Sequence, residues 1–494
     1  MTDSTTSAPR TGEAPAATGV DARSTRVIWL LLAASFVVIL NETIIGVAVP
    51  HLVGDLGIDL AAAQWLTTAF MLTMAIVLPI TGFLLQRFET RPIFLAAMTL
   101  FSTGTLIAAL APGFEVLLVA RVVQASGTAI MMPLLMTTLM TLVPPAERGR
   151  FMGRVSIVMS VAPAIGPTIS GVILQLLSWR FMFWLVLPIA LVMLVIGYRR
   201  VENVSEPRRT PLDVLSVVLS AFGFGGIVYG LSQIGGHSGA AGAMAGTQMW
   251  VSFAVGAVGL AAFIVRQLVL QRRDRALLDL RTFTSANFSI SIALMVIMMA
   301  ALFGTIILLP IYLQDVLHLE PLATGLMLLP GGLVMGLFGP LVGRLFDRFG
   351  PTPLLVPGSI VVSGVLWALT TVSETTPWWF VLGAHIMLSI GLSFMFTPLF
   401  TSALGSVAPP LYSHGSAIVG TVQQVAGAAG TALFVTIMAG RAAVAEAGGA
   451  ALDTAAATGI RSAFLVGAIL SILAIVGAFF VRRPADMPAH AAAH

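Results

Sequence analysis

One carboxylate lies deep inside an apolar stretch of the sequence. Residues 27–50, VIWLLLAASFVVILNETIIGVAVP, contain Glu42, the one acidic residue among 21 that we expect to reach neither end of its apolar run. An ionised carboxylate at the centre of a bilayer costs about 3 kcal/mol or more, so it normally faces a partner, a water-filled cavity or a proton. Glu42 is therefore the first candidate for proton or cation chemistry.

Arg121 is the predicted partner of Glu42. Each residue is about seven positions from the expected outer end of its apolar run, which places both roughly 10 Å below the outer surface at 1.5 Å per residue. An arginine neighbour favours an ionised carboxylate and burial favours a protonated one, so rearrangement would change the proton affinity. Two alternatives stay open: a static buried pair that fixes helix packing, and an Arg121 bonded to backbone carbonyls of a kinked helix nearby.

The elements that position these residues are membrane helices. The chain has 494 residues, 57% hydrophobic and 9% charged, whereas a soluble domain carries about 25% charge. A span needs about 20 apolar residues. We therefore predict an all-α membrane protein with fourteen spans, near 27–49, 62–86, 92–111, 114–140, 152–177, 180–199, 211–234, 248–270, 286–314, 322–343, 352–371, 377–403, 415–440 and 461–481.

The arginines predict the orientation. The chain contains no lysine, and with the N-terminus in the cytoplasm 21 of its 25 arginines lie inside. Arg180, Arg441 and Arg461 then lie outside, and Arg121 lies within a span. This bias follows the positive-inside rule and predicts both termini in the cytoplasm, beside anionic lipid. Since the basic residues follow the topology, the pI near 10.3 indicates no nucleic-acid partner.

Several function classes are disfavoured by what the sequence lacks. Without cysteine there are neither disulfides nor thiolate metal sites, and without lysine a GxxxxGK[ST] phosphate loop cannot be written. The sequence shows no catalytic triad and no histidine cluster. We therefore expect neither an enzyme nor a resident metal or cofactor.

An internal repeat divides the chain. GFLLQRFETRP at 82–92 aligns with GRLFDRFGPTP at 343–353, an offset of 261, and residues 120–127 align with 384–391 at an offset of 264. The second alignment places His385 opposite Arg121, where a packing role is favoured over a titrating one. Parallel repeats of this kind predict two six-helix halves related by an axis along the membrane normal. The predicted organisation is a disordered tail, a first bundle, a two-helix insert with Arg-rich flanks, a second bundle and a second tail, at 1–26, 27–199, 200–281, 282–482 and 483–494.

Four segments of the first half carry a family resemblance. LNETIIGVAVP at 40–50, GFLLQRFETRP at 82–92, ARVVQASGTA at 120–129 and APAIGPTISG at 162–171 resemble successive motifs of the major facilitator superfamily. The chain is most similar to its fourteen-helix drug:proton antiporter branch, in particular to lincomycin-resistance-like transporters. The resemblance implies the major-facilitator fold and export by antiport.

The resemblance also implies roles for particular residues. The segment at 162–171 is similar to the antiporter motif, with conformational roles for Pro163, Gly166, Pro167 and Gly171; proline and glycine there allow bending and close packing. Two departures stand out: Gln86 replaces a usual Asp and Glu89 a usual Gly, whereas the second half keeps the pair as Asp347 and Gly350. The residues implied in the cytoplasmic gating loops are Gly82, Arg87, Arg91, Gly343, Asp347 and Arg348.

The first span departs from the branch as well. The branch commonly has Asp at the position of Asn41, whereas here the carboxylate stands one residue later, about 100° around the helix. The proton-site role of Glu42 is thus inferred from its chemistry. Mostly uncharged polar groups in spans, with 23 Met and 28 Phe, favour a cavity for bulky amphipathic molecules. The candidate cavity residues are Asn41, Gln64, Trp65, Gln124 and Gln424.

We therefore predict a proton-coupled antiporter of the bacterial cytoplasmic membrane. It would export amphipathic drugs by alternating access, with a cationic drug attracted by the carboxylate, with protons and membrane lipid as the other partners, and with a monomer as the functional unit. The alternative is a proton-coupled symporter or facilitator that imports a small nutrient.

Overall fold

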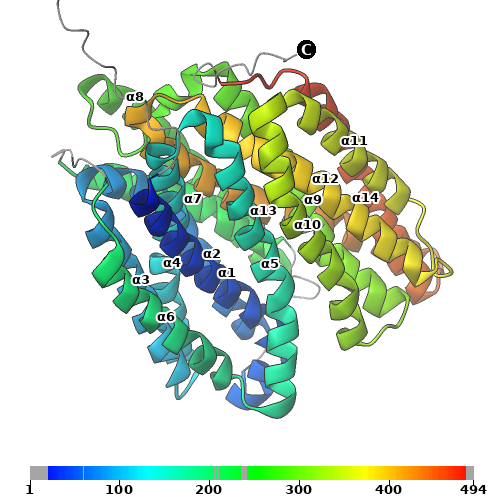
Figure 1. Cartoon of the computed structure of the whole chain (residues 1–494). Helices are drawn as coiled ribbons and strands as arrows, with labels where there is room; N and C mark the ends of the chain where they lie inside the picture. Colours follow the sequence, from blue (N-terminus) through cyan, green and yellow to red (C-terminus); the bar gives the residue numbers. More distant parts are fainter. Residues whose placement is uncertain (1–20, 59, 205–206, 208–210, 235–241, 485–494) are drawn as a thin grey trace, which may run out of the picture.

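The computed structural model describes residues 21–58, 60–204, 207, 211–234 and 242–484 (Figure 1). Over these residues the regular secondary structure is entirely helical, and fourteen helices are long and apolar enough to cross a membrane. The predicted fold class, an all-α membrane protein with fourteen spans, is confirmed. Most of both predicted tails, at 1–20 and 485–494, lies outside the described residues.

Two six-helix halves flank a two-helix insert. In Figure 1, α3 and α6 of the first half lie at the left, and α11 and α14 of the second half lie at the right. The first half contains α1 (Ala22–Leu56), α2 (Leu60–Arg87), α3 (Thr90–Ala109), α4 (Phe114–Leu142), α5 (Arg148–Leu176) and α6 (Arg180–Arg200). The insert contains α7 (Val214–Gln233) and α8 (Gly242–Leu270), and the second half contains α9 (Ala286–Ile311), α10 (Pro321–Phe349), α11 (Thr352–Leu369), α12 (Trp378–Gly405), α13 (Tyr412–Ala447) and α14 (Leu452–Ala478).

Several helices extend beyond the apolar runs that predicted them. α1 begins at Ala22, inside the predicted tail, and α14 begins at Leu452, nine residues before the predicted 461. The early turns of α14 are rich in alanine, which has the highest helix propensity but little hydropathy. A run of apolar residues marks only the part of a helix that lies in lipid, so the helical ends were missed.

The two halves meet along two pairs of helices. α5 packs along α10 in the most extensive contact between them, and α2 packs on α13. We call the end of the bundle that holds the start of α1 and the end of α14 the terminal side, and the other end the far side. Both pairs make their close contacts on the terminal side, as the glycines below show.

The insert packs against both halves. A Cβ on Gly226 of α7 would lie 2.8 Å from the Cα of Gly256 in α8, and one on Gly223 would lie 2.9 Å from the Leu260 amide nitrogen. These contacts bring the backbones of α7 and α8 together, as small residues do in membrane helices. α7 in turn lies against α2 and α13, so the insert covers one of the two seams between the halves.

Candidate functional site

Arg121 is almost completely buried, with 1% of its surface exposed. Its Nη1 donates to Gln124 Oε1 at 2.6 Å, its Nε donates to the Leu66 carbonyl of α2 at 3.4 Å, and its guanidinium lies 4.0 Å from the centre of the Phe70 ring. Arg121 is thus held by its own helix and by α2. The hydrogen bond to the Leu66 carbonyl agrees with the alternative in which Arg121 bonds the backbone of a nearby helix.

Glu42 lies near Arg121 without bonding it. The two side chains are close enough to interact electrostatically, yet among the described residues no ion pair within 4.0 Å joins them. In this conformation the predicted partners interact at longer range, and the guanidinium donates to Gln124 and to the Leu66 carbonyl. Glu42 is a half-buried carboxylate in the middle of a long membrane helix.

The helix α5 presses on α1 one residue after Glu42. A Cβ on Gly166 would collide with the side chain of Thr43, whose hydroxyl donates to the carbonyl of Leu40 at 3.0 Å. Gly166 is therefore required for this close approach of α5 to α1. Pro163 and Pro167 lie inside α5, whereas a Cβ on Gly171, nearer the far side, would meet nothing within 4 Å.

Four glycines form the terminal-side seam between α5 and α10. A Cβ on Gly339 would lie 2.6 Å from the Gly153 carbonyl oxygen, and one on Gly149 would lie 2.5 Å from the Gly343 carbonyl oxygen. The reciprocal additions at Gly153 and Gly343 would strike the backbone of the partner helix as well. Each helix carries its two glycines four residues apart, so one face of each lies backbone to backbone against the other.

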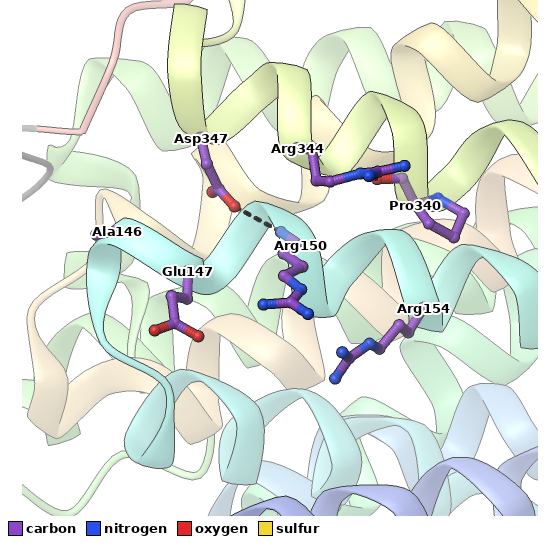
Figure 2. Close-up of a pocket in the computed structure, with 7 residues that line it drawn as sticks. All are labelled: Ala146, Glu147, Arg150, Arg154, Pro340, Arg344 and Asp347. Carbon is purple, nitrogen blue, oxygen red and sulfur yellow. Dashed lines mark hydrogen bonds between the residues drawn. The ribbon is translucent and has the colours of Figure 1, made fainter. Parts of the chain in front are cut away.

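Asp347 closes this seam at its terminal-side edge. Its Oδ1 accepts from the Gly149 amide at 2.7 Å. Its Oδ2 accepts from the Arg150 amide at 2.8 Å, the hydrogen bond drawn in Figure 2. These amides belong to the first turn of α5, which lacks intrahelical acceptors and carries the positive end of the helix dipole. A carboxylate of the second half therefore caps a helix of the first half. Arg483 in turn donates to the Asp347 carbonyl at 2.9 Å.

The equivalent contact of the first half is different in kind. Gln86, 261 positions before Asp347, donates through Nε2 to the Pro410 carbonyl at 2.9 Å, just before α13. A Cβ on Gly82, the equivalent of Gly343, would lie 3.2 Å from both the Ala417 Cβ and His414 Nδ1. This contact is neutral and its packing is looser.

The predicted gating arginines lie around these contacts rather than in them. Arg91 donates to the Tyr198 carbonyl of α6 at 2.6 Å and lies 5.0 Å from the centre of its ring. Arg348 lies 5.0 Å from the ring of its neighbour Phe349, and Arg87 ends α2 on the terminal side.

The predicted cavity residues differ in their surroundings. Gln124 is completely buried between α3 and α4, where its Nε2 donates to Thr105 at 2.8 Å and its Oε1 accepts from Arg121. Gln124 therefore lines no open cavity here, because helix packing satisfies its amide. Gln64 is exposed at the far-side start of α2, and the ring of its neighbour Trp65 lies 5.7 Å from that of Tyr229 in the insert.

Two candidate cavity residues keep an unsatisfied amide. Asn41 Nδ2 and Gln424 Nε2 are buried and have no hydrogen-bond acceptor in the described part of the protein. A buried amide without a partner is unfavourable, so Asn41 and Gln424 differ from Gln124, whose amide is bonded within the protein.

A further contact, which the sequence did not predict, joins two repeat-equivalent residues. Arg148 is buried at the start of α5, and its Nη2 donates to the Met140 carbonyl and to the Tyr412 hydroxyl, each at 3.0 Å. Tyr412 begins α13, 264 positions later, which is the offset of the second repeat pair. Equivalent residues meet only near a repeat axis, so the offset could have identified this contact.

Close packing between the halves ends near the middle of the bundle. The outermost glycine in the seam is Gly332 of α10, where a Cβ would collide with Ala164 of α5. Farther toward the far side, a Cβ on Gly325 of α10 or on Gly171 of α5 would meet nothing within 4 Å. The glycine contacts between α5 and α10 therefore lie on the terminal side and near the middle, and none of these glycines shows such a contact toward the far side.

Comparison with known proteins identifies the family. Residues 31–431 match the Major Facilitator Superfamily. The chain belongs to this superfamily. It is 40% identical to the lincomycin resistance protein LmrB of Bacillus subtilis (strain 168) over 459 residues, which cover 92% of this chain and 95% of that protein. It is also 29% identical to the multidrug resistance protein B homolog of Mycobacterium tuberculosis (strain ATCC 25618 / H37Rv), over 87% of this chain and 79% of the relative.

Solved structures of the superfamily share the fold. The human organic anion transporter MFSD10 (TETRAN) superposes with a TM-score of 0.67 at 13% identity, over 92% of this chain and 99% of that one. A double-Trp mutant of XylE superposes with a TM-score of 0.66 at 13% identity, over 93% and 96%. The family match, the curated relatives and the fourteen apolar helices of the described chain together make this protein a multi-pass membrane transporter of the major facilitator superfamily and not an enzyme.

Proposed function

We propose that this transporter is a proton-coupled antiporter that exports amphipathic drugs from the cytoplasm. The observation that carries the proposal is Glu42, a half-buried carboxylate in the middle of α1 without an ion-pair partner in the described chain. Such a group binds a proton or a cation readily. Relatives named for lincomycin and multidrug resistance support a drug as the exported molecule.

The terminal side faces the cytoplasm in this proposal. Placing it there puts 21 of the 25 arginines on the inner face, as the positive-inside rule requires. The conformation described above, closed on the terminal side, is then the outward-facing one.

The transport cycle follows from one carboxylate and two conformations. In the outward-facing state Glu42 takes a proton from outside, and the protonated protein opens inward. Glu42 loses its proton to the cytoplasm, a drug binds, and the loaded protein returns to the outward-facing state. Arg121, held in place by Gln124 and by α2, supplies the fixed positive charge that favours deprotonation.

The α5 motif couples Glu42 to the seam. Gly166 packs on Thr43 next to the carboxylate, and the same helix carries Gly149 and Gly153 at the terminal-side closure. A change at Glu42 that shifts α1 therefore acts directly on the helix that seals the cytoplasmic side.

The test is proton-driven drug efflux in proteoliposomes. With an imposed pH difference, the Glu42→Gln variant is expected to lose uphill drug transport, because its amide does not titrate. The matched control is Glu115→Gln, which removes an exposed carboxylate at the far-side start of α4 and should transport as the wild type does. Uphill export by Glu42→Gln at the wild-type rate would refute the role of Glu42. Proton-driven accumulation of a substrate in cells would favour the symporter instead.

A further inference from the structure

We propose that the terminal-side crevice between α5 and α10 binds the phosphate headgroup of an anionic phospholipid. The crevice is a pocket of about 490 Å³ lined by Ala146, Glu147, Arg150, Arg154, Pro340, Arg344 and Asp347. Figure 2 shows Arg150 and Arg154 on α5 and Arg344 on α10 around it, with one wall from each half of the protein.

The pocket presents three guanidinium groups that no carboxylate neutralises at contact distance. Neither Arg150, Arg154 nor Arg344 takes part in an ion pair within 4.0 Å in the part of the chain that the structure describes. Arg154 lies 4.5 Å from the centre of the Phe151 ring and 5.3 Å from that of Trp29. Arg344 Nε makes one long contact of 3.4 Å with the Pro340 carbonyl. Most of their N–H donors are thus available to an oxyanion.

The two acids of the pocket do not cancel this charge. Both oxygens of Asp347 accept from the first amides of α5, and Glu147 is the remaining carboxylate. Three arginines therefore face one carboxylate whose oxygens are not engaged with α5. Arginine forks match phosphate oxygens in geometry and charge, so a phosphate group is the anion that fits.

The surroundings favour a lipid over a soluble anion. Leu341, Leu337 and Leu333 precede Arg344 on the same face of α10 and are 41%, 75% and 36% exposed. These side chains form an apolar strip that leads from the pocket into the bilayer, where an acyl chain would lie. Arg344 is five residues from the end of α10 and Arg154 is six from the start of α5, about 8–9 Å along each helix. Guanidinium groups at this depth extend to the phosphate level of a leaflet.

A headgroup bound here would act on the conformational equilibrium. Arg150 and Arg154 belong to the first half and Arg344 to the second, so the three surround one site only while the seam is closed. A ligand shifts an equilibrium by its difference in affinity for the two states. An anionic lipid therefore stabilises the closed seam. The proposal rests on the terminal side facing the inner leaflet, where anionic lipid is available, as proposed above.

The first experiment measures lipid binding to the purified full chain by native mass spectrometry with phosphatidylglycerol and with phosphatidylcholine. We expect selective retention of phosphatidylglycerol and a loss of about tenfold in its binding for Arg344→Gln and Arg154→Gln, the equivalent of one charge-assisted hydrogen bond. The matched control is Arg348→Gln, which removes an exposed arginine of α10 that stacks on Phe349 outside the pocket. Equal phosphatidylglycerol binding by wild type, Arg344→Gln and Arg154→Gln would overturn the proposal.

The second experiment measures the seam directly. The absence of native cysteine allows spin labels at Thr141→Cys in α4 and Ala408→Cys before α13, two exposed terminal-side positions in different halves. In nanodiscs, phosphatidylglycerol is expected to increase the closed population several-fold over phosphatidylcholine, and Arg344→Gln to abolish the increase. An increase reproduced by inorganic phosphate alone in detergent would assign the pocket to a soluble anion and refute the lipid. Both experiments are independent of drug transport, so their failure would leave the antiport proposal standing.

Discussion

The two repeat-related contacts on the terminal side use different chemistry at equivalent positions. In the second half, Asp347 accepts from two amides at the start of α5, at 2.7 and 2.8 Å. In the first half, the equivalent Gln86 donates once, to the Pro410 carbonyl at 2.9 Å. The Asp347 contact consists of two charge-assisted hydrogen bonds, whereas the Gln86 contact consists of one neutral hydrogen bond.

The packing beside these contacts differs in the same direction. Gly343 and Gly149 place the backbones of α10 and α5 in contact, so that an added Cβ would meet a carbonyl oxygen. Gly82 has space for a Cβ at 3.2 Å from Ala417 and His414, a tight but adjustable contact. The two repeats therefore form equivalent seams, α5 with α10 and α2 with α13, but the contacts within the two seams differ in strength. We infer that the seam between α2 and α13 separates more easily than the seam between α5 and α10.

The largest difference is expected between alanine substitutions at the two equivalent glycines. Gly343→Ala would drive α10 away from α5, because a backbone carbonyl cannot move aside as a side chain does. Overpacking of this kind costs about 1–3 kcal/mol, or roughly 5- to 150-fold in the closed population. Gly82→Ala is expected to change the closed population by about twofold or less. Distances between labels at Thr141→Cys and Ala408→Cys measure both, and equal effects would contradict the comparison.

An effect of similar size is expected from Asp347→Asn. The asparagine side chain keeps one oxygen that can accept from a backbone N–H of α5. It places its NH₂ group against the second backbone N–H, and it removes the negative charge. Loss of a charged hydrogen bond costs about 1.5–3 kcal/mol, which would reduce the closed population by roughly tenfold or more. The matched control, Asp453→Asn, removes a carboxylate that faces His318 on the far side and should leave the population unchanged. A closed population unaltered by Asp347→Asn would show that this cap contributes nothing to closure.

Substitution of Gln86 tests the weaker contact. Gln86→Ala removes one exposed neutral hydrogen bond, worth about 0.5–1.5 kcal/mol, so a change of about threefold is expected. Gln86→Asp, which restores the carboxylate of the repeat, should favour closure if it reaches the first amides of α13. If Gln86→Ala opened the protein more than Asp347→Asn does, the order of the two seams would be reversed.

The smallest effect concerns a carboxylate that caps its own helix. Asp213 accepts from the Ser216 amide at 3.0 Å at the start of α7 and from Arg266 of α8 at 2.6 Å. The hydrogen bonds from Arg266, followed by those from Ser216, lower the pKa of Asp213 from its usual 3.8 to about 2. Because this pKa is depressed in the folded protein, the stabilisation is present above pH 3.8 and is lost as the pH falls towards 2.

Asp213→Asn should therefore lower the thermal unfolding temperature by a constant, small amount from pH 5 to 8. Asparagine still caps the helix, so the substitution removes only the partly exposed ion pair with Arg266, worth about 0.2–1 kcal/mol, and the difference from wild type should shrink below pH 4. Unfolding followed by tryptophan fluorescence provides the measurement. A difference that varied between pH 5 and 8 would show that another group titrates with the pair.

The sequence by itself determined the fourteen membrane helices and the membership of the superfamily. Spans of about 20 apolar residues are a local requirement of the bilayer, and the repeat that relates Gln86 to Asp347 is visible in the letters alone. The cap at Asp213 is local as well, since it acts on a residue three positions later.

The tertiary structure alone decided which groups meet. Depth along a helix placed Glu42 and Arg121 at one level, but only the rotation of α4 against α2 and α3 directed the guanidinium to Gln124 and the Leu66 carbonyl. Asp347 caps a helix that begins 199 residues before it, at Arg148, a contact that no local pattern contains. Local physics fixes the elements because each helix satisfies its own backbone in lipid, whereas contacts between helices depend on how their faces turn towards one another.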